Sequence, residues 1–188
     1  MIKDPKSGSN KYLLVESARI PDTYQPPGGV FKMHDDSYIK ELEAIPDDDF
    51  HEKLDFRFKL KRKKIPELLK KFDSRRSREI SIQREFHEEL VQTKILPQEL
   101  FPWVNSSYLK THTFFGYSDH FKIDEFKLFE IYDIVLSEEQ ERHILELLNQ
   151  ASNKYVFADA DTIDKRGYDR GSTIQELKIR PHTKLLIS

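Results

Sequence analysis

The chain has 188 residues, of which 34% are charged, and its net charge at neutral pH is −2. This length suits one domain with a substantial core, and the near balance of charge excludes a general attraction to polymeric nucleic acid or acidic membranes. The absence of cysteine excludes disulfides, zinc thiolates and cysteine nucleophiles, so a cytoplasmic location is expected.

The first half of the chain alternates between short extended and short helical segments. Residues 1–10 are polar and are expected to form a flexible leader, followed by a single domain over residues 11–188. A strand is predicted over 11–20, a Pro-Gly turn follows it, and a short helix is expected near 38–43. Apolar and polar residues alternate over 54–60, which predicts a half-buried strand.

Two further helices are predicted before the middle of the chain. Pro66 is typical of a first helical turn, so a helix is expected to begin there. A longer helix is expected from Ser77 to Gln92, because Phe86 and Leu90 continue an apolar repeat of four residues. Its apolar stripe lies about a quarter turn from the flank that carries Glu85.

The second half of the chain predicts a hairpin followed by a capped helix. Strands are expected over 107–117 and 121–136, with the hairpin turn at 118–120. A capping box at residues 137–140 predicts the start of a helix. Residues 155–158 are a last strand candidate, residues 159–171 read as a loop, and the final segment is ambiguous between helix and strand. Mixed strands and helices indicate an α+β fold.

Three carboxylates share one flank of the helix predicted over Ser77–Gln92. Glu85, Glu88 and Glu89 stand at positions i, i+3 and i+4, which are surface neighbours on a helix. Like charges at this spacing repel unless a cation shares the site, and hard divalent ions prefer oxygen ligands. The alternative is a solvated acidic face, which is common in a chain this rich in charge.

The context of these carboxylates resembles a known family. A strand candidate runs into the turn Pro26-Pro27-Gly28-Gly29, and the later helix reads Arg84-Glu85-Phe86-x-Glu88-Glu89. This combination resembles the Nudix family, whose box joins a glycine to an Arg-Glu-x-x-Glu-Glu helix. The resemblance implies that the glutamates hold Mg²⁺ or Mn²⁺ against a pyrophosphate.

The sequence departs from the ordinary Nudix box in its spacing. Residues 30–83 separate Gly29 from Arg84, far more than the box contains; its early glutamate has no counterpart at the usual distance, and Val91 replaces its closing glycine. This architecture is similar to the SMODS-associated Nudix-like domain of bacterial CBASS anti-phage systems. That resemblance implies an α/β/α sandwich with a mixed sheet and an insertion at about residues 33–76.

The resemblance also implies roles for individual residues. The expected metal ligands are Glu85, Glu88 and Glu89, with Glu85 and Glu89 as the catalytic pair if the domain is an enzyme. The expected nucleotide contacts are Gly28, Gly29, Arg84, Arg57, Arg76 and Arg78. A fourth acid could come from Asp124, Glu125 or Glu130, and the aromatic residues that could stack on a base are Tyr24, Trp103, Tyr108 and Phe114.

Three functions are compatible with these residues. The favoured hypothesis is a sensor that binds a cyclic oligonucleotide made by a partner nucleotidyltransferase, because the insertion is basic and the box is degraded. The alternative is a Mg²⁺-dependent hydrolase of a nucleoside diphosphate derivative, which the intact trio of glutamates favours. The third is a scaffold for assembly. A homo-oligomer, and a tether to the inner membrane outside these residues, remain open alternatives.

Overall fold

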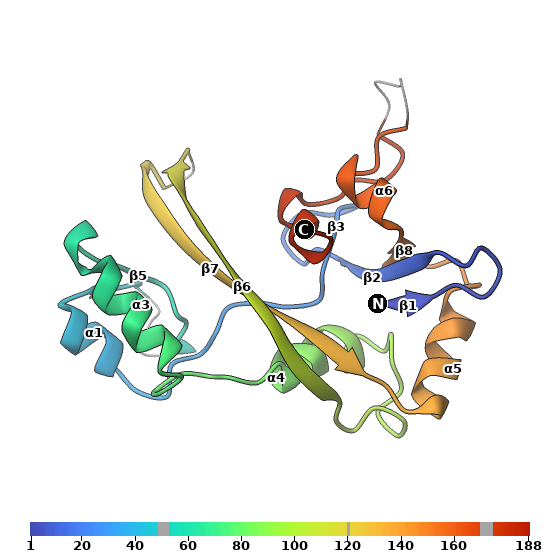
Figure 1. Ribbon diagram of the computed structural model, residues 1–188, viewed down its shortest axis with the longest axis horizontal. Coiled ribbons are helices and arrows are strands. Elements are labelled where there is room, and N and C mark those ends of the chain that lie inside the picture. The colour runs from blue at the N-terminus through green and yellow to red at the C-terminus, as the bar shows by residue number, and fades with distance from the viewer. Residues whose placement is uncertain (49–52, 120, 170–174) are drawn as a thin grey trace. The chain divides into compact units, whose positions relative to one another are not determined.

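The computed structural model describes residues 1–48, 53–119, 121–169 and 175–188. The chain folds as two units: the first joins Met1–Pro27 to Gln83–Ser188, and the second is Gly28–Ile82 (Figure 1). The sequence predicts one domain with an insertion at 33–76, and that insertion falls inside the second unit. In the described part of the chain, no helix has the length and apolar character needed to cross a bilayer.

A small antiparallel sheet organises one end of the first unit. Its central strand β2 (Asn10–Glu16) confirms the strand expected over 11–20 and pairs with β1 (Ile2–Lys3), β3 (Tyr24–Gln25) and β8 (Tyr155–Ala158). Leu14 of β2 is fully buried in this core. The expected flexible leader instead contributes β1, because the Ile2 side chain is buried.

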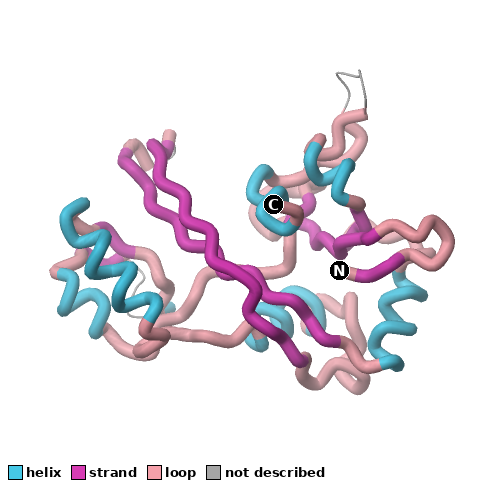
Figure 2. Tube along the Cα trace, in the orientation of Figure 1, coloured by secondary structure: helices cyan, strands magenta, loops and turns pink. Residues whose placement is uncertain are grey.

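A long hairpin is the largest element of the first unit. Strands β6 (Asn105–Ser118) and β7 (Ile123–Val135) pair antiparallel along their whole length, as the sequence predicts (Figure 2). Their register shifts between Tyr108 and Lys110, where one extra residue forms a bulge. His120 of the expected turn lies outside the described residues. The named strand pairings are all antiparallel, and the α/β/α sandwich with a mixed sheet stays a prediction.

The described residues of the C-terminal part of the first unit form three short helices. Helix α5 (Glu138–Leu147) begins with the predicted capping box, in which Ser137 and Gln140 exchange hydrogen bonds. Helix α6 (Ala160–Asp164) lies where a loop was expected, because the Asp159 side chain accepts a hydrogen bond from the Thr162 amide and caps it. Residues 170–171 of that expected loop lie outside the described residues. The ambiguous final segment forms a 3-10 helix, η3 (Pro181–Leu186).

The second unit combines short helices with a two-stranded sheet. Helix α1 (Ser37–Leu42) and helix α3 (Ile65–Asp73) confirm the two helices expected there, and α3 has a proline in its first turn. A 3-10 turn, η1 (Arg62–Lys64), precedes α3. The strand expected over 54–60 is shorter, since β5 (Phe58–Lys59) pairs with β4 (Ile45–Pro46) only at those positions.

A buried arginine organises the core of the second unit. Arg78 is 1% exposed, and its guanidinium lies 3.7 Å from the ring centre of Phe72 and 5.2 Å from that of Phe31. Its Nε and Nη2 both donate to the Phe72 carbonyl at 3.1 Å. That carbonyl lies in the last turn of α3, where the helix dipole favours a cation. Arg78 therefore closes α3 and is packed between aromatic rings.

The helix that carries the glutamates begins later than predicted. Helix α4 spans Gln83–Phe86 and continues as a π-helix, η2 (His87–Val91), whereas the periodicity predicts a start at Ser77. Ser77 has a φ of +57°, which is incompatible with a right-handed helix, and Arg78 is fixed in the second unit. The tertiary contacts of Arg78 therefore determine where α4 begins. The spacing of apolar residues in the sequence carries no information about these contacts.

Candidate functional site

One arginine joins two of the three candidate glutamates. Arg84 Nη1 lies 2.7 Å from a carboxylate oxygen of Glu85 and donates to a carboxylate oxygen of Glu88 at 3.0 Å. The Glu85 side chain is more deeply buried than that of Glu88, which is nearly half exposed. A guanidinium between two carboxylates lowers their mutual repulsion, so Arg84 itself is the cation of this cluster.

The helix widens at the position of the remaining glutamate. The Gln92 amide donates to the His87 carbonyl at 2.9 Å, a bond between residues i and i+5 that defines the π-turn. Just after this turn, the Thr93 hydroxyl donates to the Glu89 carbonyl at 2.7 Å. Turns of this kind are rare and occur often at functional sites. The turn breaks the α-helical spacing on which the alignment of Glu85 with Glu89 depends.

The carboxylates suit a divalent ion by chemistry but are not arranged around one. Glutamate oxygens are the ligands that Mg²⁺ and Mn²⁺ prefer. However, Glu85 and Glu88 are both turned onto Arg84. Throughout the described residues, no three histidine or acidic side chains gather where they could hold a metal ion. The arrangement therefore does not fit a metal centre, and the three ligands remain a prediction from the resemblance.

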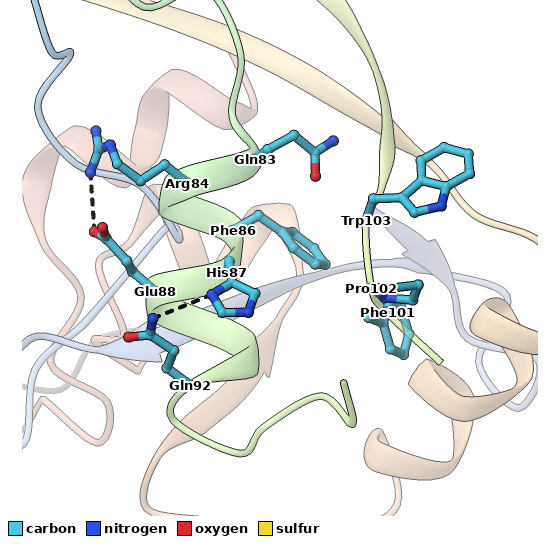
Figure 3. A pocket seen from close by; sticks show the side chains of 9 residues that line it. All are labelled: Gln83, Arg84, Phe86, His87, Glu88, Gln92, Phe101, Pro102 and Trp103. Atoms are coloured by element: carbon cyan, nitrogen blue, oxygen red, sulfur yellow. Dashed lines mark hydrogen bonds and ion pairs between the residues drawn. The ribbon is translucent and has the colours of Figure 1, made fainter. Parts of the chain in front are cut away.

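A cavity of about 470 Å³ lies beside this helix within the first unit (Figure 3). The helix contributes Gln83, Arg84, Phe86, His87, Glu88 and Gln92. The segment leading into β6 contributes Phe101, Pro102 and Trp103. In Figure 3, Phe86 and His87 project toward that segment, the Arg84–Glu88 pair projects away from it, and Gln92 extends toward the Glu88 side while bonded to His87.

Hydrogen bonds hold the polar side of the cavity in place. His87 Nε2 lies 2.8 Å from Gln98 Oε1, and His87 Nδ1 lies 3.3 Å from Gln92 Nε2. Both contacts are satisfied together when the neutral ring carries its proton on Nε2, because Nδ1 then accepts from the Gln92 amide. Gln98, His87 and Gln92 thus form one chain of donors and acceptors, in which Gln98 belongs to the segment that follows the helix.

The side chain of Gln83 fixes the Phe101–Trp103 side of the cavity to the helix. The Val104 amide donates to Gln83 Oε1 at 3.2 Å, and Gln83 Nε2 donates in turn to the Val104 carbonyl. Val104 directly follows Trp103, so this pair of bonds sets the backbone beside the indole. The rings of Phe86 and Phe101 are both buried, with centres 6.3 Å apart, and form the floor between the walls.

The predicted nucleotide contacts outside the helix belong to the second unit. Gly28 has a φ of +149°, in the region that favours glycine, and Gly29 is exposed. Arg57 lies 3.8 Å from a carboxylate oxygen of Asp55, and Arg76 is exposed. The structure gives Arg78 a different role, since it is buried in the core. Whether the glycine turn faces the glutamates stays a prediction.

The other candidate residues are distributed over the first unit. Among the acids, Asp124 is exposed on β7, Glu125 pairs with Lys127 at 2.9 Å, and Glu130 accepts from the Tyr132 hydroxyl at 2.8 Å. Among the aromatic candidates, Tyr24 donates to the Asn153 carbonyl, Tyr108 stacks edge-on against Tyr132, and Phe114 lies near Lys127. Trp103 is the aromatic candidate that lines the cavity.

Sequence reasoning did not single out the glutamines at the cavity. Gln83 and Gln92, which line it, and Gln98, which contacts His87, carry no charge and belong to no motif, so their role is visible only through their contacts. The five-residue spacing of His87 and Gln92 places them on different faces of an α-helix. They come together because the turn between them is a π-turn.

A family model described as the SMODS-associated NUDIX domain matches residues 2–187, which is nearly the whole chain. No curated protein and no solved structure gives a significant match.

Proposed function

Because this chain belongs to the SMODS-associated NUDIX domain family, we propose that it recognises a nucleotide signal in an antiviral CBASS system. The family places it with the SMODS nucleotidyltransferase systems. The ligand is then a cyclic oligonucleotide made by that nucleotidyltransferase, and the domain relays its presence to an effector. The family alone gives no ligand, so the argument for recognition depends on the residues themselves.

The pairing of Arg84 with Glu85 and Glu88 is the observation that carries this proposal. Two of the carboxylates that a hydrolase would use for its metal are engaged by a side chain of the same helix. A binding domain tolerates this arrangement, since binding needs shape and hydrogen bonds and no reactive centre. The neighbouring cavity, with aromatic and amide side chains, supports a small-molecule ligand.

The basic segment of the second unit supplies candidate contacts for phosphate. Residues 57–78 contain eleven lysines and arginines and only two acidic residues. Several are engaged with acids of the same unit, as where Lys71 lies 2.6 Å from Glu41. Arg57 and Arg76 stay in the proposal because their side chains reach the surface, and guanidinium groups bind phosphate oxygens in pairs. Gly28 and Gly29 stay as backbone contacts.

A hydrolase of nucleoside diphosphate derivatives is the second candidate. Its support is the set of three glutamates within five residues of one helix, whose oxygens suit Mg²⁺ or Mn²⁺. In that case Glu85 and Glu89 are the catalytic pair, and a bound ion supplies charge against the pyrophosphate. The two candidates differ in one measurable property, which is turnover.

The test is to incubate the full chain with Mg²⁺ and a panel of cyclic di- and trinucleotides beside nucleoside diphosphate sugars. Calorimetry measures binding and chromatography measures products. We expect binding of a cyclic oligonucleotide without product, weakened by Arg57→Gln or Arg76→Gln and by added salt. Release of a monophosphate that needs the metal, is lost in Glu89→Gln and persists in the control Glu99→Gln would overturn the sensor.

A further inference from the structure

We propose that the cavity beside α4 and η2 is a nucleobase site, in which Trp103 stacks on the base and the Gln92 amide reads its edge. This inference rests on the proposed function, since it specifies which part of a nucleotide ligand this surface takes. The volume of about 470 Å³ lies within the range of ~300–1,000 Å³ that is usual for small-molecule sites. It suits one nucleotide unit of a larger ligand.

The aromatic wall presents an exposed indole on a fixed segment of backbone. Trp103 is 59% exposed, whereas Phe86 and Phe101 beneath the cavity are 5% and 1% exposed. The backbone next to Trp103 is fixed to the helix by the two hydrogen bonds between Gln83 and Val104. An aromatic face held in this way binds a flat ring with little loss of conformational freedom.

The polar wall has the hydrogen-bonding capacity that a base requires. A glutamine amide has two N–H donors and an oxygen with two lone pairs, so Gln92, which lines the cavity, has capacity beyond its contact with His87. Base edges present the same alternation of donors and acceptors. The His87 imidazole, itself held by Gln98, orients the Gln92 amide, which favours one pattern of donors and acceptors over another.

The charge at the cavity favours a neutral ring over a phosphate group. The two charged side chains that line it, Arg84 and Glu88, pair with each other at 3.0 Å and point away from the segment that carries Trp103. A phosphate would meet a neutralised pair there, whereas a base needs no counter-charge. Stacking depends on the π-face that every base has, and the Gln92 amide then decides which base is preferred.

The single tryptophan of the chain makes the test direct. Because Trp103 is the only tryptophan, intrinsic tryptophan fluorescence reports on this cavity alone. The full chain is titrated with the four ribonucleoside 5′-monophosphates, the matching nucleosides, and ribose 5-phosphate, which has no base. Free N-acetyltryptophanamide, titrated in parallel, corrects for light absorbed by the bases. We expect saturable quenching by at least one base, as nucleoside or nucleotide, and none by ribose 5-phosphate.

Variants separate stacking from edge recognition. Trp103→Ala should weaken binding, measured by calorimetry, by about 5- to 150-fold, which corresponds to the ~1–3 kcal/mol typical of base stacking on an aromatic side chain. Trp103→Phe should retain most of the affinity. Gln92→Leu should change the order of preference among bases. The matched control is Tyr117→Ala, a variant of a 60% exposed aromatic residue on the hairpin, which should leave binding unchanged.

The outcomes distinguish this inference from the proposed function. If a cyclic oligonucleotide binds but no base quenches Trp103, the base site is wrong and the sensor stands. If bases quench Trp103 but no cyclic oligonucleotide binds, the base site stands and the sensor is wrong. Equal quenching by ribose 5-phosphate, or unchanged affinity in Trp103→Ala, would also overturn the base site.

Discussion

Arg84 Nη1 lies 2.7 Å from a carboxylate oxygen of Glu85, and the same nitrogen reaches Glu88 at 3.0 Å. One guanidinium nitrogen thus serves two carboxylates that the family resemblance assigns to a metal ion. Two cations cannot share these oxygens at bonding distance, so a divalent ion that binds there competes with Arg84. The strength of that competition can be measured.

Removing the arginine should therefore tighten metal binding. Arg84→Gln is expected to increase the affinity for Mn²⁺ by up to about five-fold, since partly exposed ion pairs of this kind contribute ~0.2–1 kcal/mol. The measurement is titration of free Mn²⁺ by electron paramagnetic resonance. Lys94→Gln, which removes an exposed positive charge from the same segment, controls for net charge. Weaker binding in Arg84→Gln would mean that Arg84 positions the ligands and does not compete for them.

Arg78 should be essential for the second unit and dispensable for the first. Arg78→Lys keeps the charge but loses the paired bonds to the Phe72 carbonyl, at an expected cost of about 3 kcal/mol in unfolding free energy. Amide hydrogen exchange over residues 28–82 is the suitable measurement, because the only tryptophan lies in the first unit. Arg76→Lys is the matched control at an exposed site. Equal exchange in both variants would contradict this role.

Asp159 should make part of the stability depend on acid pH. Hydrogen bonds from the Thr162 amide and hydroxyl, and then the ion pair with Lys11, lower the pKa of Asp159 to about 2. Because the folded pKa is below the unfolded value of ~3.8, this stabilisation is present above about pH 4 and disappears as the pH falls toward about 2.

Urea unfolding of wild type and Asp159→Asn across that pH range checks this prediction. The asparagine keeps a helix-capping oxygen and removes the charge, so the two stabilities should converge on acidification. Asp159→Ala removes the cap as well and should cost about 1 kcal/mol at neutral pH. Parallel pH profiles for wild type and Asp159→Asn would contradict the assignment.

Gly167 should tolerate no side chain. A Cβ added there would lie 1.7 Å from the Leu177 carbonyl oxygen, and the backbone has a φ of +78°. Gly167→Ala is therefore expected to cost well over ~2 kcal/mol, measured as a fall in the unfolding free energy. Gly8→Ala isolates the conformational part, because Gly8 has a φ of +68° with open space around its Cβ position. A similar cost for both variants would show that the Leu177 contact relaxes.

Local sequence signals were sufficient to predict a helix or strand where a few neighbouring residues determine that it forms. The capping box at Ser137, the proline at the start of α3 and the hydrophobic run of β8 each predicted the element that is observed. The same kind of signal was present for α6, since Asp159 and Thr162 form a cap, but the polar composition of that segment obscured it. Local chemistry therefore decides these elements.

The remaining features depend on contacts that a linear pattern does not contain. The positive φ of Ser77 and the burial of Arg78 delay the start of α4, although the apolar repeat continues through that region. The cavity likewise depends on Gln83 reaching Val104, twenty-one residues further along the chain. The carboxylates and Trp103 could be singled out by residue type, whereas the pairing of Arg84 with two of those carboxylates could not.

The π-turn at His87–Val91 has a practical consequence for mutagenesis of this helix. A turn closed between residues i and i+5 holds one residue more than an α-turn, so it acts as a single-residue insertion in helical phase. A scan that numbers faces continuously from Gln83 would assign side chains beyond Val91 to the wrong side. Deleting one residue within the turn restores the ordinary phase and leaves His87 and Gln92 four residues apart, so the two side chains remain on the same side of the helix.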